Sequence, residues 1–312
     1  MLTVETSGIK GITSFTTYDS GELKECKLDD YNLISTKYGD LVPQYGNPGI
    51  RKKELKALSF YKSGKIKNIS LEKQTEISTP IGIFPAELLT FFEDGSINSL
   101  FPLNGQISAF WSEEEEGALA QEFDFAFPFG KFSAKIIGLR FYQDGKVRSL
   151  ILWPTEKIII DTPAGKMPVR IGFKLFEDGS IESVEPANPV TVKTPIGSIN
   201  AYDADALGID ADTNSLRFDR TGKLISLITF DIITVRKSNG EKEIIYPKLR
   251  PGLIEEFEKV PIKLLFDDDI VSIDDGTEKA DYRIPECTFL IMRGNYIETK
   301  TCGDCSSCKG CM

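Results

Sequence analysis

Apolar and polar positions follow one recurring twelve-residue pattern along this chain. The pattern reads apolar, any, apolar, usually aromatic, any, Asp or similar, Gly, Lys or Ser, apolar, any, usually Ser, apolar. Three copies follow it almost completely: LTFFEDGSINSL at 89–100, LRFYQDGKVRSL at 139–150 and FKLFEDGSIESV at 173–184. Apolar alternation on both sides of a glycine indicates two short strands joined by a tight turn, so each copy predicts a β-hairpin.

Four more segments carry the pattern less completely. LSFYKSGKIKNI at 58–69 and LRFDRTGKLISL at 216–227 keep the glycine and the outer apolar positions. FTTYDSGELKEC at 15–26 and IKLLFDDDIVSI at 262–273 lose more, and the last has Asp268 in place of the glycine. Glycine adopts positive φ without steric cost, and Asp is among the other residues that best tolerate it. We predict a weaker turn at Asp268 and hairpin turns at Gly21, Gly64, Gly95, Gly145, Gly179 and Gly222.

The third position of the pattern is the better core candidate, because the fourth position includes Asp219. The third position is filled by Phe60, Phe91, Phe141, Leu175, Phe218 and Leu264. We predict that Phe91, Phe141 and Phe218 point into one core while the Lys or Ser after each glycine stays exposed. Cys26 fills the last apolar position of its copy, which predicts a buried thiol. The pattern leaves open whether the loops have two residues, or three with a bulge.

A second element, Thr-Pro-x-Gly, precedes most of the hairpins. It stands at 79–82, 162–165 and 194–197, with weaker forms at 36–39 and 127–130. Proline fixes φ and glycine permits a chain reversal, so these segments predict further turns between strands.

Together these elements predict an all-β fold, a β-hairpin repeat array that forms a rolled or solenoid-like meander. At most one short helix is expected, over 251–260, where apolar residues follow helical spacing and Pro251 stands near the start. A cysteine-rich tail ends the chain. The predicted division is a hairpin repeat region at 1–245, the short helix with a degenerate final hairpin at 246–301, and the four-cysteine tail at 302–312.

The composition is that of an ordinary globular protein, with 41% hydrophobic and 27% charged residues. The acidic net charge of −10 would repel a phosphate backbone, so nucleic acid is not an expected partner. Residues 1–15 carry no basic leader followed by an apolar stretch, and no window approaches the roughly 18 to 20 apolar residues of a spanning helix. We therefore expect a soluble cytoplasmic protein with no membrane partner.

The chain contains no histidine. Histidine is the usual proton shuttle near neutral pH, so its absence excludes Ser/His/Asp and Cys/His triads, His-ligated zinc hydrolases and facial-triad iron sites. Any catalysis would rest on carboxylates, lysine, tyrosine, cysteine or a bound cofactor. The sequence favours a protein that is not an enzyme.

The candidate chemical site is the tail TCGDCSSCKGCM, whose cysteines stand at every third position: Cys302, Cys305, Cys308 and Cys311. A reducing cytoplasm disfavours disulfides, and a Cys-x2-Cys loop lets two thiolates converge on one metal. Without histidine an internal site is all-cysteine, which fits zinc or an iron–sulfur cluster. The even spacing favours a cluster of the [4Fe–4S] type over zinc, with the source of the fourth ligand open. A thiol–disulfide relay and an inert tail are the alternatives.

Three other segments are weaker candidates. Cys287, upstream of the tail, is a candidate for an extra ligand. The segment DADALGIDADTN at 203–214 begins like a calcium loop, but Ser215 replaces the required glycine and no glutamate closes it. We interpret it as an exposed acidic loop, and the glutamates at 113–116 as a solvated loop insertion.

The aromatic, Asp-Gly-Lys, Ile hairpins resemble those of MORN-type repeat proteins, including antitoxin-like bacterial members with repeated YY-x-NG-K hairpins. The resemblance covers the turn segments, while the unit length, the Thr-Pro-x-Gly elements and the cysteine tail depart from it. It implies a repeat scaffold for binding. The sequence thus favours a non-catalytic β-repeat scaffold that binds a partner protein while its tail carries a cluster or zinc. The alternatives are a redox protein or enzyme subunit that uses the tail, and an antitoxin-like regulator.

Overall fold

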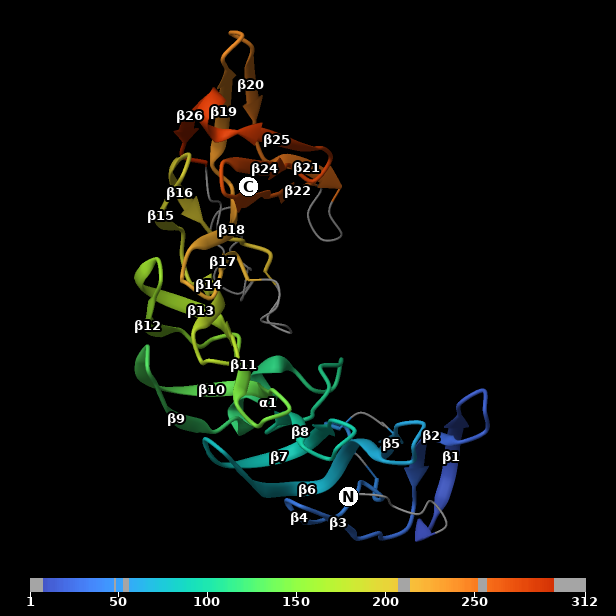
Figure 1. The fold of residues 1–312 in the computed structure, drawn as a ribbon. Helices are drawn as coiled ribbons and strands as arrows, with labels where there is room; N and C mark the ends of the chain where they lie inside the picture. The colour runs from blue at the N-terminus through green and yellow to red at the C-terminus, as the bar shows by residue number, and fades with distance from the viewer. Residues whose placement is uncertain (1–7, 48, 53–55, 207–213, 252–256, 295–312) are drawn as a thin grey trace, which may run out of the picture. The chain divides into compact units, whose positions relative to one another are not determined.

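The computed structural model describes residues 8–47, 49–52, 56–206, 214–251 and 257–294. These residues form antiparallel β-hairpins, which confirms the predicted all-β fold class (Figure 1). The chain divides into two compact units: residues 1–187 with 207–223 form unit 1, and residues 188–206 with 224–312 form unit 2. In the part of the chain that the structure describes, no helix is long and apolar enough to cross a membrane.

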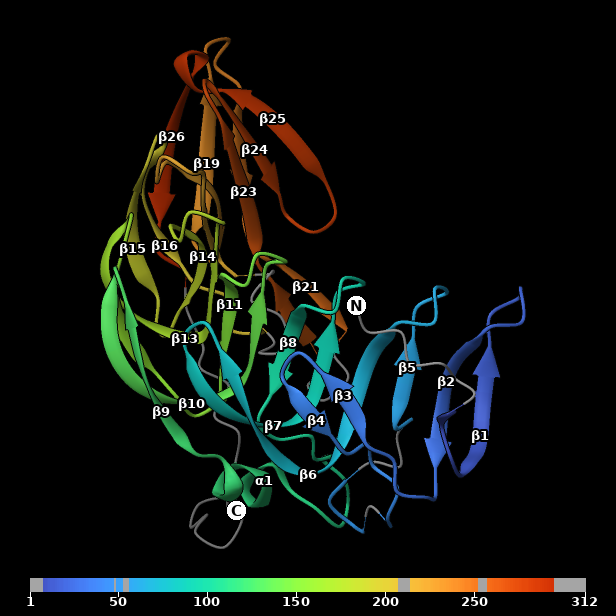
Figure 2. The same ribbon diagram turned by 60° about the horizontal axis from the view of Figure 1, so that its bottom comes forward.

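The main sheet of unit 1 is a meander in which every strand is antiparallel to its neighbours. Its strands lie in the order β1 (Ile12–Thr17), β2 (Leu23–Leu28), β5 (Leu58–Phe60), β6 (Ile66–Thr79), β7 (Gly82–Phe91), β8 (Ile97–Phe101), β10 (Gly130–Phe141), β11 (Val147–Leu152), β13 (Gly165–Leu175), β14 (Ile181–Pro186) and β17 (Leu216–Phe218). The order in the sheet follows the order in the chain, so the pairing is local. Figure 2 shows the first of these strands side by side, with β1 at the outer end of the row.

Each predicted glycine turn is present, and the six turns share one loop type. The amide of Gly145 donates to the carbonyl of Tyr142 at 2.9 Å, and the amide of Tyr142 donates to the carbonyl of Lys146 at 2.8 Å. Gly145 has a φ of 88°, as expected for the left-handed residue of a three-residue loop with a bulge. The same bonds and a φ between 78° and 98° occur at Gly21, Gly64, Gly95, Gly179 and Gly222. The structure thereby settles the loop length that the sequence left open.

A further β-bulge recurs at the tenth position of the pattern. Arg140 pairs with Ser149, but Phe141 pairs with Val147, so Arg148 has no residue opposite it. The same step in register occurs at Lys24, Lys67, Asn98 and Glu182. A bulge bends its strand and increases the local twist, so these hairpins all bend at the same position.

Neighbouring copies join through one pairing rule. In the five copies that begin at residues 58, 89, 139, 173 and 216, the first position pairs with the twelfth position of the copy before it, and the second position pairs with the eleventh. Leu139 thus pairs with Leu100, and Arg140 pairs with Ser99. The other first-position pairs are Leu58 with Cys26, Leu89 with Ile69, Phe173 with Leu150 and Leu216 with Val184. The junction between hairpins is therefore constant along unit 1.

The third position forms the core of unit 1, as predicted. Phe91, Phe141 and Phe218 are each 1% exposed. Full burial of such a side chain contributes about 1.5 to 3 kcal/mol, so the row of aromatics is a main source of stability. Cys26 is also buried, as predicted, and burial raises the pKa of its thiol to about 11. This thiol is a packing group.

The residues after the glycines are only partly as predicted. Lys146 and Lys223 are exposed, but Ser96 is buried. The hydroxyl of Ser96 donates to the carboxylate of Asp94 at 2.5 Å, and its amide donates to the same oxygen at 2.8 Å. The prediction of an exposed residue is therefore wrong at Ser96, which is 7% exposed.

Tyrosines at the fourth position tie neighbouring hairpins together. The hydroxyl of Tyr142 donates to the backbone carbonyl of Leu175 at 2.7 Å. Two other tyrosines make the equivalent bond at 2.8 Å, Tyr18 to Phe60 and Tyr61 to Phe91. In each case the acceptor is the third-position residue of the next copy. The fourth position thus adds a side-chain link to the backbone pairing.

The Thr-Pro-x-Gly segments and their weaker forms are turns, as predicted, and each closes a hairpin arm. In unit 1 the arms are β6 with β7, and three further pairs: β3 (Ile34–Thr36) with β4 (Gly39–Leu41), β9 (Glu122–Phe127) with β10, and β12 (Ile158–Thr162) with β13. Thr162 lies opposite Gly165, and its hydroxyl donates to the Gly165 carbonyl at 2.7 Å. In Figure 1 the tips of β6–β7, β9–β10 and β12–β13 lie on the same side of unit 1.

Phenylalanines pack the β9–β10 arm against neighbouring strands. Phe125 of β9 stacks on Phe84 of β7, with ring centroids 5.9 Å apart. Phe127 of β9 meets Phe173 of β13 edge to face, with ring centroids 5.2 Å apart. Aromatic pairs of this kind add about 0.5 to 1.5 kcal/mol beyond the area that they bury. The arm is therefore a packed part of unit 1.

The described strands of unit 2 pair in four antiparallel groups. Its strands are β15 (Val190–Thr194) with β16 (Gly197–Ala201); β18 (Leu224–Thr229), β23 (Ile262–Asp267), β24 (Ile270–Asp274) and β25 (Lys279–Arg283); β20 (Lys242–Ile245), β19 (Ile232–Lys237) and β26 (Cys287–Met292); and β21 (Lys248–Pro251) with β22 (Phe257–Val260). A 3-10 helix, η3 (Ile284–Glu286), precedes β26. The predicted turn at Asp268 joins β23 and β24, and Asp268 has a φ of 45°.

The helix predicted over 251–260 is wrong. Pro251 ends β21 and pairs with Phe257, the first residue of β22, so both ends of the segment belong to a β-hairpin. The only α-helix in the described ranges is α1 (Glu113–Leu119), which the sequence reading took for a solvated loop. Ser112 caps it: the Ser112 hydroxyl accepts the Glu115 amide, and the Glu115 carboxylate accepts the Ser112 amide. This capping box explains how so short a helix begins.

Candidate functional site

The predicted metal site lies outside the described residues. Cys302, Cys305, Cys308 and Cys311 all fall in the final segment, 295–312. The structure therefore adds no geometry to the spacing that the sequence provides. The all-cysteine site remains a prediction from the sequence.

The two remaining cysteines occupy different environments. Cys26 is buried in the core of unit 1, where its side chain is 0% exposed. Cys287 is half-buried at the first position of β26, opposite Lys237 of β19. Over the described ranges, no group of three or more His, Cys, Asp or Glu side chains is arranged to hold a metal ion.

The acidic segment at 203–214 is described only at its two ends. At one end, the carboxylate of Asp203 accepts the amide of Asp205 at 3.0 Å, which forms a local turn. At the other end, Asn214 is buried, and its side-chain amide donates to the hydroxyl of Ser183 at 3.1 Å. Asn214 therefore serves packing in unit 1, while residues 207–213 lie outside the described residues.

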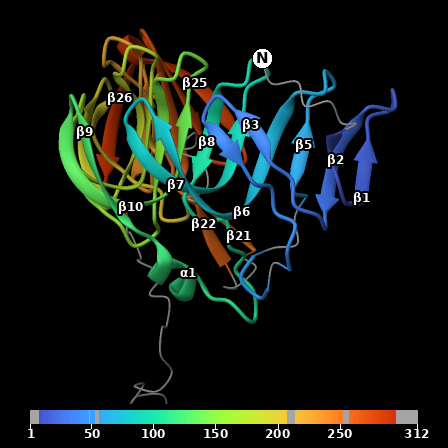
Figure 3. The same ribbon diagram turned by 90° about the horizontal axis from the view of Figure 1, so that it is seen from below.

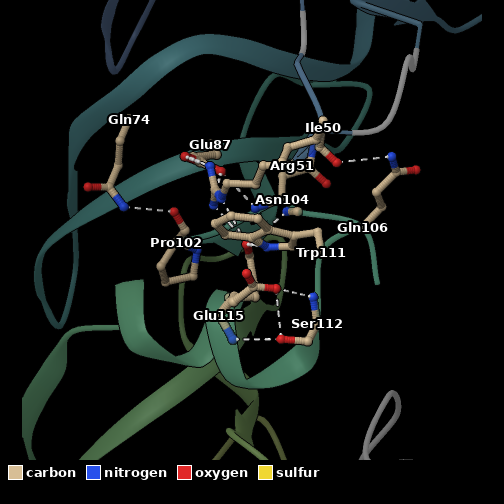
Figure 4. A network of polar contacts seen from close by, with 12 residues as sticks. Ile50, Arg51, Gln74, Glu87, Pro102, Asn104, Gln106, Trp111, Ser112 and Glu115 are labelled. Carbon is tan, nitrogen blue, oxygen red and sulfur yellow. Dashed lines mark hydrogen bonds and ion pairs between the residues drawn. The ribbon is translucent and has the colours of Figure 1, made fainter. Parts of the chain in front are cut away.

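A polar cluster in unit 1 brings charged side chains together from three segments (Figure 4). We call it the arginine clasp, defined by Arg51, Glu87, Trp111 and Glu116. Arg51 lies before β5, Glu87 lies on β7, and Glu116 lies on α1. The Arg51 guanidinium forms ion pairs of 2.8 Å with each glutamate, and both carboxylates are almost fully buried. The residues come together only in the folded chain.

Every carboxylate oxygen in the arginine clasp accepts a hydrogen bond from the protein. The Glu87 oxygens accept two Arg51 nitrogens, and one of them also accepts the Asn104 amide at 2.8 Å. The Glu116 oxygens accept two Arg51 nitrogens together with the Gly105 amide and the Trp111 ring nitrogen. Buried charges are stable only when paired and bonded in this way.

The electrostatics of the arginine clasp favour the ionised state of its arginine. Burial disfavours the charged guanidinium, but hydrogen bonds and charge attraction from Glu87 and Glu116 outweigh it and raise the pKa of Arg51. A Cβ at Gly105 would overlap the Glu116 carboxylate, so the loop also fits closely around the charge. A metal ion would have to displace Arg51 to reach these oxygens. The clasp therefore has the chemistry of a structural tie that fastens α1 and its loop to the sheet.

Glu116 corrects the sequence interpretation of 113–116 as a solvated insertion. Glu113 to Glu115 are exposed, but Glu116 is 3% exposed and bonded to Arg51. The Ser112-x-x-Glu115 capping box was a readable signal for the helix. No local signal pointed to Arg51, which is separated from Glu116 by 65 positions.

Strand β1 is the other unusual feature of unit 1. All six of its residues are exposed, and Phe15 is 60% exposed. Among the described strands, only β2 pairs with β1. Phe15 and Thr17 border an open groove together with Leu23 and Lys62. An uncovered, uncharged strand edge is a template for pairing with another strand.

Comparisons with known proteins add no relative. The chain matches no protein family, no curated protein and no solved structure.

Proposed function

We propose that this protein is a non-catalytic cytoplasmic scaffold that binds a partner protein and carries an all-cysteine metal site in its tail. The observation that supports the scaffold most directly is the constant junction between hairpins in unit 1. A sheet built by repeating one junction offers an extended surface, as repeat arrays do when they bind other proteins. The MORN-type resemblance of the turn segments implies the same kind of role.

The polar chemistry of unit 1 is compatible with a binding role. Both buried carboxylates of the arginine clasp are bonded by the protein itself, and Cys26 is packed in the core with a raised pKa. These groups hold the fold together. The residues that we assign to metal binding are Cys302, Cys305, Cys308 and Cys311, which would hold an iron–sulfur cluster or zinc.

A redox function is the second candidate. It is favoured by the cysteine spacing, because Cys-x2-Cys pairs are also the reactive units of thiol–disulfide relays. In that case the tail would exchange electrons or disulfides with the bound partner. The scaffold would then hold the two proteins together while the exchange takes place.

The metal content of the purified protein separates these functions. Anaerobic purification of the intact chain should give bound iron with acid-labile sulfide, or stoichiometric zinc. A chain ending at Thr301 should lose the metal and unfold at nearly the same temperature, because the described core of unit 1 contains no tail residue.

The matched control is Ser307→Ala, which changes the tail but leaves its four cysteines and Cys287 in place, and it should keep the metal. An intact chain that takes up neither zinc nor a cluster after anaerobic reconstitution would rule out the metal site. Reversible disulfide formation within such a metal-free tail would favour the relay.

A further inference from the structure

The junction rule of unit 1 specifies what is missing beside β1. In the inner copies, the first-position residue is covered by the twelfth-position residue of the copy before it. The first-position residues of the inner copies are all 0% exposed: Leu58, Leu89, Leu139, Phe173 and Leu216. Phe15 holds the first position of its copy, no described strand lies beside it on that edge, and it is 60% exposed. Figures 2 and 3 both show β1 at the outer end of the row of strands.

Strand β1 has the same β-bulge as the inner strand β10. Thr13 forms a bulge in β1, two residues before Phe15, and Ile137 forms the same bulge in β10, two residues before Leu139. β10 nevertheless accepts β8 on its other edge, through Leu139 and Arg140. The bulge is therefore compatible with a second neighbour, and β10 serves as an internal template for a strand bound to β1.

The edge of β1 also lacks the features that usually prevent pairing. Proteins protect edge strands with charged side chains, proline or a covering element. Strand β1 has the sequence ITSFTT, without a charged residue or proline. By contrast β25, which pairs only with β24 among the described strands, has the sequence KADYR and is soon followed by Pro285. The chain thus protects one outer strand with charges and leaves the other open.

We propose that the edge of β1 binds an antiparallel strand of the partner protein. The junction rule sets its chemistry: an aliphatic residue lies opposite Phe15, and the residue before it, opposite Thr16, is small or polar. Inside the chain, Leu100 fills the first of these places, opposite Leu139, and Ser99 fills the second, opposite Arg140. The bound strand gains backbone hydrogen bonds from the edge and covers Phe15, as in other cases of strand addition. The inference deepens the proposed scaffold function and rests on it.

The pattern favours a partner over a second copy of this chain. A second copy would have to supply a strand that ends in a twelfth-position residue. In the described residues these strands are already paired: Cys26 with Leu58, Ile69 with Leu89, Leu100 with Leu139, Leu150 with Phe173, Val184 with Leu216, Leu227 with Leu264 and Ile273 with Ala280. We therefore assign the matching strand to the partner protein.

Fluorescence anisotropy with a labelled peptide tests the proposal on the intact chain. The probe is a synthetic peptide with the sequence of residues 95–103, GSINSLFPL, which carries the Ser99 and Leu100 pair in the required order. We expect saturable one-to-one binding to the parent chain. Phe15→Asp should weaken it by roughly tenfold or more, because a charge replaces the apolar surface that the strand covers. Phe15→Leu should keep most of the affinity.

The matched control is Ile159→Asp, since Ile159 is also 60% exposed and lies in an arm of unit 1. It should bind the peptide like the parent chain, and a probe with Leu100→Asp should not bind the parent. Hydrogen exchange should show slower amide exchange in β1 when the parent probe is bound. Thermal unfolding of Phe15→Asp should match that of the parent, because the replaced side chain is exposed.

Four results would overturn the proposal. The peptide fails to bind, or it binds Phe15→Asp as well as it binds the parent. Sedimentation shows a dimer that Phe15→Asp converts to a monomer, which would make a second copy the occupant. Binding appears only after residues 1–7 are removed, which would make the chain's own first segment the occupant. Metal content measured on the same samples tests the tail separately, so failure at β1 and failure at the cysteines are distinguishable.

Discussion

The hairpins at Gly145 in unit 1 and at Asp268 in unit 2 carry the same pattern but close in different registers. In the first, Phe141 at the third position pairs with Val147, and the glycine completes a three-residue loop. In the second, Leu264 at the third position pairs with Ile273, and the strands continue without a bulge to Asp267 and Ile270.

The fifth position explains the difference. In the glycine hairpins this position belongs to the loop and is polar, as with the exposed Gln143. In the Asp268 hairpin it is Phe266, which is 5% exposed. Burial of this aromatic extends both strands into the segment where the glycine hairpins turn. The glycine and the polarity of the fifth position together therefore decide the register of the hairpin.

The largest expected effect comes from the core of the glycine hairpins. Phe141→Ala should lower the free energy of unfolding by about 3 to 5 kcal/mol, because the side chain is 1% exposed and leaves a cavity. Chemical denaturation of the intact chain measures the change. Ile159→Ala, at a 60% exposed position, should change it by less than about 0.5 kcal/mol. A loss below about 1 kcal/mol for Phe141→Ala would show that the third position does not anchor the hairpin.

Exchanging the turn residues tests the comparison directly. Gly145→Ala should cost about 1 to 2 kcal/mol, because the residue has a φ of 88° and its new Cβ would lie 3.2 Å from Pro80. Asp268→Gly should stay within about 1 kcal/mol of the parent, because relief of the left-handed backbone opposes the extra entropy of glycine in the unfolded chain. Equal losses in both variants would mean that the two turns have the same requirements.

The tyrosine link between copies should contribute less. Tyr142→Phe removes one hydrogen bond to Leu175 and should cost about 0.5 to 1.5 kcal/mol. Tyr31→Phe, at a 54% exposed position, is the control and should leave the free energy of unfolding unchanged. Similar values for the two variants would mean that the fourth position does not link the hairpins.

The smallest effect should be a pH dependence at the Asp94 turn. Hydrogen bonds from Ser96 and Gln143 lower the pKa of Asp94 to about 2, from an ordinary value of 3.8. The folded-state pKa is depressed, so the stabilisation is present above about pH 4 and is lost as the pH falls toward 2. The stability difference between the parent and Asp94→Asn should shrink over that interval in urea titrations. A difference that is constant from pH 7 to pH 2 would contradict this assignment.

Most of the fold could be predicted from the sequence because the residues that specify each hairpin lie close together in the chain. A glycine between alternating apolar residues specifies a hairpin within twelve positions, so the turns at Gly95 and Gly145 needed no knowledge of distant residues. The same local reading failed at 251–260, where Leu253, Ile254 and Phe257 suggested a helix. There Phe257 pairs with Pro251 in a β-hairpin, because pairing with a neighbouring strand overrides a short helical spacing.

The sites were less readable because their parts are far apart or outside the described residues. Arg51, Glu87 and Glu116 meet only through the fold, so the sequence showed Glu116 as one of a run of acidic residues. The exposure of Phe15 was also hidden, since the pattern gives it the same position as the buried Leu139. The difference is that Leu139 has a described neighbour on both sides, β8 and β11, whereas Phe15 has one only in β2.

The constant junction has a consequence for how such a chain can evolve. Successive copies begin at Leu58, Leu89, Leu139, Phe173 and Leu216, and these starting points are unevenly spaced. The extra residues lie in the arms and in the loop that carries α1, while the paired positions stay the same. If a whole copy were duplicated or lost, the new neighbours would again pair through the first position of one copy and the twelfth position of the other. Array length and arm length can therefore change independently during evolution without a new strand interface.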